Sequence, residues 1–181
     1  VPANAIVRGN PARISGYVGS ISNSAEGSAV TGPQSATTEP SIRDTAVAGV
    51  RVHRFPLHRD LRGSLVASEF GRDIPFEPQR TFLVFDVPSA EIRGQHAHRV
   101  CHQFISCIHG ECFLVADDGH AREEFRLDDA TLGIHVPPMI WCTQFRHSHD
   151  AILLVHASHG YDPADYIRNY EDFLDEVRCH P

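Results

Sequence analysis

The sequence predicts a small all-β barrel that carries one C-terminal helix. From Val50 onwards, short apolar segments recur about every ten residues and are separated by turn residues, as is typical of a sandwich or barrel. The motif Asp117-Asp118-Gly119 between two of these segments predicts a tight hairpin. After the last apolar segment the spacing changes from that of strands to that of a helix.

Nine segments carry the strand signal. The expected strands are Gly49–Phe55, Ser64–Phe70, Arg80–Val87, Val100–Ile108, Glu111–Ala116, Ala121–Leu127, Thr131–Val136, Ile140–Phe145 and Ala151–Ala157.

One amphipathic helix is expected at the C-terminal end of the chain. Asp162 can cap it, and Pro163 suits its first turn. Its apolar face is formed by residues three or four apart. These are Ile167, Tyr170, Leu174 and Val177.

The composition divides the chain into three parts. Residues 1–18 resemble the last coils of the left-handed β-helix of hexapeptide-repeat acyltransferases, although so short a tail cannot fold as such a domain. Residues 19–49 are rich in Ser, Ala, Thr, Gly and Pro and are expected to form a flexible linker. Residues 50–181 form the expected barrel domain. Because the chain begins with Val1 and not Met, we expect it to be part of a longer product.

Charge and cysteine content exclude several classes of protein. A net charge of −7 argues against a surface that coats nucleic acid. The apolar runs are too short to cross a bilayer. The five cysteines include no CxxC pair, which indicates reduced thiols in a cytoplasmic protein and not a disulfide framework or a zinc ribbon.

The strongest chemical signal is a His-x-His motif. In an extended strand, His96 and His98 project to the same face, so both can enter one cavity. His102 has the same parity if the strand continues without a bulge. The spacing from this pair to Gln103 and Gly110 resembles the first cupin motif, in which a Glu normally stands at the position of Gln103.

The presence of Gln103 where cupins normally have a Glu affects metal binding. The expected second-motif region, Gly133–Trp141, has no His shortly after its prolines, so two of the four usual cupin ligands are missing. We therefore expect no metal and no other cofactor, with substitution by His102 or His135 as the open alternative.

An imidazole pair without a metal can still move protons. Histidine has an ordinary pKa near 6.5, so it can both accept and return a proton at working pH. Removing a proton next to a ketone gives an enediolate, and returning it to the neighbouring carbon moves the carbonyl by one position.

A family resemblance extends over residues 50–178. Its segments are Asp60–Leu65, Glu69–Phe76, Arg80, Phe85–Pro88, Arg93–His98, Asp117–Gly119, Pro137–Trp141, and Tyr161, Asp162 and Asp165–Arg168. In this order they resemble the WxcM-like C-terminal cupin family, the 3,4-ketoisomerases of deoxysugar biosynthesis.

The resemblance implies a metal-independent, homodimeric jelly roll that converts dTDP-4-keto-6-deoxyglucose to its 3-keto isomer for lipopolysaccharide or S-layer glycans. It implies that His98 shuttles the proton between C3 and C4, and that His96 assists with the hydroxyl and carbonyl protons. Some members follow a hexapeptide-repeat acetyltransferase, which fits the tail at residues 1–18.

Five residues are candidate substrate contacts. Arg80 and Arg93 are assigned to pyrophosphate or sugar, because a planar guanidinium suits phosphate oxygens. His102, Gln103 and Trp141 are assigned to the substrate cavity, with a core position as the alternative for Trp141. The family often has tyrosines in the segment that here reads Arg80–Asp86 without any.

Three other functions remain open from the sequence. They are a metal-dependent cupin enzyme, a dTDP-sugar 3,5-epimerase, and a non-catalytic sugar-binding cupin. An epimerase typically pairs one His with Asp and Tyr, which the paired histidines fit less well.

Overall fold

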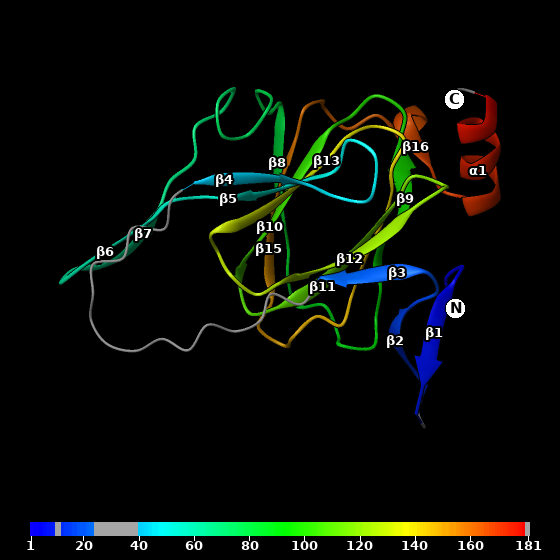
Figure 1. Ribbon diagram of the computed structural model, residues 1–181, viewed down its shortest axis with the longest axis horizontal. Coiled ribbons are helices and arrows are strands. Elements are labelled where there is room, and N and C mark those ends of the chain that lie inside the picture. Colours follow the sequence, from blue (N-terminus) through cyan, green and yellow to red (C-terminus); the bar gives the residue numbers. More distant parts are fainter. Residues whose placement is uncertain (10–11, 24–39, 180–181) are drawn as a thin grey trace.

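The computed structural model describes residues 1–9, 12–23 and 40–179, and its main body is two sheets packed face to face (Figure 1). In order across the first sheet lie β4 (Ser41–Asp44), β5 (Arg51–Arg54), β13 (Leu132–Val136), β10 (Gln103–His109), β15 (Ile152–Ala157) and β8 (Arg80–Val84). In order across the second lie β16 (Tyr166–Ile167), β9 (Arg93–His98), β14 (Trp141–Phe145), β11 (Cys112–Asp117), β12 (Arg122–Leu127) and β3 (Ser20–Asn23). The predicted jelly-roll barrel with one C-terminal α-helix is therefore present.

The main core lies between the two sheets. Strand β15 shows why: Leu153, Val155 and Ala157 alternate along it and are almost fully buried, because alternate side chains of a strand face the same side. Ile105 lies beside them on the neighbouring strand β10, Leu114 faces them from β11 of the opposite sheet, and both are fully buried. Each of the Leu, Val and Ile side chains contributes about 1.5–3 kcal/mol of hydrophobic free energy to the packed barrel.

The predicted hairpin at Asp117-Asp118-Gly119 joins β11 to β12. Gly119 has a φ of 87°, which favours glycine, and its N–H donates to Asp117 Oδ1 over 2.7 Å. Asp118 Oδ1 accepts from the backbone of His120 and Ala121. The two aspartates thus stabilise the turn as the motif predicts.

The C-terminal helix begins later than expected. Asp162 does act as a cap, but of a short 3-10 turn, Pro163–Asp165, and not of an α-helix. The chain then pairs with β9 as β16, and α1 spans only Tyr170–Cys179. Asn169 caps this helix by accepting from the N–H groups of Glu171 and Asp172. The two strand residues interrupt what the sequence presents as one helical segment.

The ends of the expected linker are strands. β3 pairs in parallel with β12, and β4 pairs with β5, so both lie in the barrel sheets. They are edge strands held by backbone hydrogen bonds, which explains why the expected strand pattern is absent there. The barrel therefore begins before Val50, and the rest of the expected linker, residues 24–39, lies outside the described residues.

The described part of the expected acyltransferase tail forms an antiparallel pair, β1 (Ala5–Arg8) with β2 (Arg13–Tyr17). Within that part there is no coil of a left-handed β-helix, which stacks its strands in parallel. Tyr17 is buried against Phe145 and Val115 of the barrel. The segment packs on the barrel as an added hairpin.

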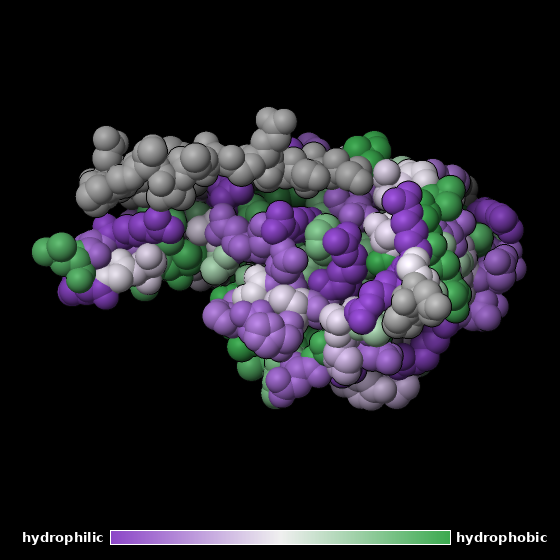
Figure 2. Space-filling view, turned by 90° about the horizontal axis from the view of Figure 1, so that it is seen from below, coloured by the Kyte–Doolittle hydropathy of each residue, from purple (hydrophilic) through white to green (hydrophobic). Residues whose placement is uncertain are grey.

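A second hairpin, β6 (Leu57–Asp60) with β7 (Gly63–Val66), projects from the barrel. Its end is apolar at the surface, as the space-filling view shows (Figure 2), and Leu61 and Leu65 are exposed. Among the described residues, no helix is both long enough and apolar enough to cross a membrane. All five cysteines are unpaired, in agreement with the sequence.

Candidate active site

Strand β9 carries His96 and His98 on the face that points into the barrel, as the His-x-His spacing predicts. Their ring centroids lie 5.0 Å apart. Ala97 between them is fully buried on the opposite face, in the cluster beneath α1. Gly94 allows β9 to lie close to β14, since a Cβ there would sit 2.6 Å from the carbonyl oxygen of Cys142 and its φ is 76°. The glycine thereby fixes where the two histidines stand.

His98 lies at the centre of a buried hydrogen-bond chain. Its Nδ1 is 2.6 Å from Asp165 Oδ2, and its Nε2 is 3.0 Å from the amide nitrogen of Gln103. An ionised carboxylate can only accept, so Nδ1 carries the proton and Nε2 presents its lone pair to the Gln103 amide. Gln103, at the position where cupins carry a Glu, therefore contacts His98 as an amide donor.

Asp165 is held in place by the turn that follows β9. Its Oδ1 accepts from the Val100 N–H over 2.7 Å, and its backbone carbonyl accepts from the Arg99 N–H over 2.9 Å. These bonds also explain why the strand expected from Val100 begins only at Gln103. The buried carboxylate thus faces His98 from a rigid frame.

An aromatic ring and two cations complete the site. The Tyr166 ring centroid is 4.3 Å from that of His98 and 4.9 Å from that of His96. Arg80 donates to the Tyr166 hydroxyl over 3.4 Å, and the guanidinium of Arg168 lies 4.2 Å from the ring centroid. Among the described residues, the buried Arg80 Nε has no hydrogen-bond partner. The site therefore has positive charge available for an anionic group.

The surroundings keep both histidines neutral. Burial lowers the pKa of His96 to about 4, and the neighbouring His98, Arg168 and Arg80 contribute to the same shift. Burial also lowers the pKa of His98, although Asp165 opposes this shift through its hydrogen bond and its charge. Unprotonated imidazole is the form that accepts a proton.

Three expected substrate contacts lie elsewhere. His102 follows the turn after β9 and faces outwards, where its Nδ1 is 3.0 Å from His135 Nε2. Arg93 is exposed at the other end of β9. Trp141 is buried in the cluster under α1 against Phe173, because it alternates with the inward-facing Cys142. For Trp141 the core position, the alternative noted from the sequence, is the one observed.

The sequence left open whether His102 or His135 replaces one of the missing cupin metal ligands, and their positions bear on this. Both rings stack on the outer side of the first sheet, beside Phe76. His96 and His98 point into the barrel instead, so within the described ranges the two outward rings do not rebuild the four-ligand cupin set there.

Sequence reasoning missed Asp165 and Tyr166 as site residues. Asp165 and Tyr166 lie in the segment Asp165–Arg168 that supports the family resemblance, and this was the signal that could have identified them. The apolar spacing of the residues that follow, from Ile167 to Val177, indicated a helix over this segment. That interpretation hid the contact of Asp165 and Tyr166 with β9.

A two-sheet jelly roll with an inward-pointing histidine pair on β9 defines the chain as a cupin-type protein. Residues 48–178 match the family model described as "FdtA: WxcM-like, C-terminal". The chain belongs to this family.

The chain is also similar to individual proteins and solved structures. The chain is 41% identical over 123 residues to the TDP-4-oxo-6-deoxy-alpha-D-glucose-3,4-oxoisomerase of Aneurinibacillus thermoaerophilus, covering 68% of this chain and 88% of the relative. A mutant of the 3,4-ketoisomerase QdtA of Thermoanaerobacterium thermosaccharolyticum, solved with TDP-4-keto-6-deoxyglucose, is 30% identical with a TM-score of 0.72, covering 74% of this chain and 97% of QdtA. The TDP-quinovose 3,4-ketoisomerase WlaRB of Campylobacter jejuni is 35% identical with a TM-score of 0.69, covering 71% and 99%.

Proposed function

We propose that this chain is a TDP-sugar 3,4-ketoisomerase of deoxysugar biosynthesis that converts dTDP-4-keto-6-deoxyglucose to its 3-keto isomer. The observation that carries the mechanism is the buried chain Asp165–His98–Gln103, which holds a neutral imidazole with its lone pair directed into the barrel. Relatives of the same family bear this activity in their names, and QdtA has been solved with the 4-keto sugar nucleotide.

The proposed reaction moves one carbon-bound and one oxygen-bound proton. His98 Nε2 removes the proton from C3, and the electrons of the broken C–H bond form the C3–C4 double bond of an enediolate. The same imidazolium returns its proton to C4, while the hydroxyl proton passes from O3 to O4. The carbonyl then stands at C3, and no electrons leave the sugar.

Three neighbours support His98 in this role. Asp165 fixes the ring orientation and stabilises the imidazolium that forms during the reaction. Gln103 occupies the Nε2 lone pair and must release it when the C3–H group of the substrate takes its place. His96, on the same face of β9, is placed to exchange protons with the sugar oxygens.

Positive charge beside the histidines suits the anionic part of the substrate. Arg80 has a buried Nε without a partner in the described residues, so a phosphate or sugar oxygen can satisfy it. Arg168 stands on the other side of the Tyr166 ring. We assign Arg80 to substrate binding, and we withdraw that assignment for Arg93, His102 and Trp141.

The direct experiment incubates the purified chain with dTDP-4-keto-6-deoxyglucose and follows the sugar by NMR. We expect a 3-keto product whose formation needs no added cofactor or metal. An unchanged sugar would contradict the proposal. A sugar epimerised at C5 would instead favour the 3,5-epimerase alternative.

Two further features stay predictions. A homodimer is expected from the family resemblance, and the exposed Leu61 and Leu65 of the projecting hairpin offer apolar surface for it; light scattering of the purified chain tests it. A cytoplasmic location is expected from the sequence alone.

A further inference from the structure

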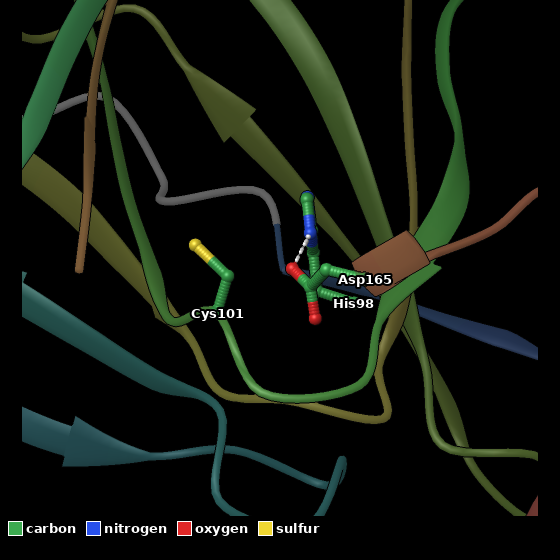
Figure 3. Close-up of side chains that lie close together, drawn as sticks. All are labelled: His98, Cys101 and Asp165. Carbon is green, nitrogen blue, oxygen red and sulfur yellow. Dashed lines mark hydrogen bonds and ion pairs between the residues drawn. The ribbon is translucent and has the colours of Figure 1, made fainter. Parts of the chain in front are cut away.

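We propose that the active site also binds a thiophilic divalent cation such as Zn²⁺ through His98, Cys101 and Asp165, and that the cation inhibits isomerisation. Each of the three residues offers one ligand atom, and these atoms all lie within 4.8 Å of one another. Figure 3 shows the Cys101 side chain beside the His98–Asp165 pair, on the turn that follows β9.

The ligand atoms of the three residues lie only slightly nearer to or farther from one another than those around a bound zinc ion. Ligand atoms around a tetrahedral zinc lie about 3.3–3.6 Å apart, given bonds of about 2.0–2.3 Å. His98 Nδ1 and Asp165 Oδ2 are already 2.6 Å apart and need only to separate slightly. No two of the three ligand atoms are more than 4.8 Å apart, so the Cys101 sulfur has to approach the other two by up to about 1.5 Å, which rotation of its side chain can supply.

The frame of the site is rigid and largely dry. His98, Cys101 and Asp165 are 6%, 2% and 9% exposed. The second oxygen of Asp165 is fixed by the Val100 N–H, so the carboxylate cannot turn away from the cluster. Preorganised ligands with their own hydrogen-bond partners bind metal more tightly.

The donor atoms determine which cation fits. One imidazole nitrogen, one thiolate and one carboxylate oxygen form a set that suits zinc and disfavours Mg²⁺ or Ca²⁺, which prefer oxygen ligands. Three protein ligands leave a fourth position for water. Binding releases one proton to solvent, that of the Cys101 thiol, whereas the proton of His98 moves from Nδ1 to Nε2 and the imidazole stays neutral.

We expect inhibition because the His98 imidazole is both the proposed base and a ligand of the cation. With Nδ1 bound to the cation, His98 loses its hydrogen bond to Asp165, and a nearby positive charge opposes formation of the imidazolium. This part of the inference rests on the proposed role of His98 as the base. Binding of the cation itself does not, so it is measured separately.

The experiment uses untagged, metal-free enzyme with Zn²⁺ and Co²⁺ as probes. Added Zn²⁺ should abolish turnover, and EDTA should restore it. Co²⁺ should give the near-ultraviolet charge-transfer band of a thiolate ligand. In Cys101→Ser, the band should disappear and the Zn²⁺ concentration for half inhibition should rise by at least about tenfold, relative to the metal-free rate of the same variant.

Cys179→Ser is the matched control, because Cys179 is the exposed thiol on α1. It should keep both the cobalt band and the zinc sensitivity of the unmodified enzyme. If Cys101→Ser does not fold, the cobalt band of the Cys179→Ser protein still reports on a buried thiolate ligand.

Two results would overturn the inference. One is the absence of a cobalt–thiolate band in the unmodified enzyme. The other is equal zinc inhibition of the unmodified and Cys101→Ser enzymes, which would place the cation elsewhere, for example on the outward pair His102 and His135. An enzyme that binds cobalt through Cys101 but isomerises no sugar would instead contradict the proposed function alone.

Discussion

His98 Nδ1 lies 2.6 Å from Asp165 Oδ2, although the two residues are 67 positions apart in the sequence. The contact joins the barrel strand β9 to the segment that leads into α1. The base is therefore oriented only when the C-terminal segment is docked, which β16 ensures by pairing Tyr166 with His98 and Ile167 with Ala97. The site is therefore complete only with this segment in place.

Replacing His98 with Asn should lower kcat by about 10²- to 10⁴-fold, the usual contribution of a general base. The amide keeps a similar size and can still hydrogen-bond to Asp165, so the melting temperature and TDP binding should change little. His120→Asn, at the exposed β11–β12 turn, is the matched control. Turnover of His98→Asn close to that of the control would remove His98 as the base.

Replacing Asp165 with Asn should lower kcat by about tenfold or more with little change in KM, because Asp165 acts through His98 and not on the sugar. The carboxylate raises the pKa of His98, so its removal should move the acidic limb of the kcat profile to lower pH. If the Asp165→Asn enzyme has a reduced rate but an unshifted limb, Asp165 is only structural.

Replacing Gly94 with Ala should impair both stability and catalysis. The new Cβ would meet the carbonyl oxygen of Cys142 at 2.6 Å, in a backbone conformation that costs a non-glycine residue about 1–2 kcal/mol. β9 must then move away from β14, carrying His96 and His98 with it. Gly19→Ala, also at positive φ but with open space around the Cβ, is the control for backbone strain alone. Equal effects on kcat in the two variants would argue against this role for Gly94.

The barrel could be predicted from the sequence because its strands are short apolar runs, such as Ala151–Ala157, separated by turn residues. The His-x-His pair could be predicted because alternate residues of one strand share a face. The contact between Asp165 and His98 depends on tertiary pairing, and local spacing instead suggested a longer helix. The orientation of His102 required knowledge of the turn after β9, which Asp165 stabilises. Edge strands β3 and β4 lack an apolar pattern, so nothing local distinguishes them from a linker.

Stability should fall in mild acid because the surroundings of two histidines, the partly buried His96 and the buried His135, oppose their protonation. Burial lowers the pKa values of His96 and His135 to about 4, against an ordinary value of 6.5 in the unfolded chain. Between these values the unfolded state binds more protons, so the free energy of unfolding should decrease as the pH falls from about 6.5 to about 4. Urea unfolding at several pH values measures the slope, and His135→Asn should make it shallower. A slope unchanged in that variant would show that His135 does not contribute.

The central claim is that one imidazole carries a proton between C3 and C4 of the sugar. The most direct test runs the reaction on dTDP-4-keto-6-deoxyglucose in deuterated water and locates the label by NMR. If His98 exchanges its proton with solvent during turnover, deuterium should appear at C4 of the 3-keto product and disappear from the product pool in His98→Asn. Label at C5 with none at C4 would contradict the account.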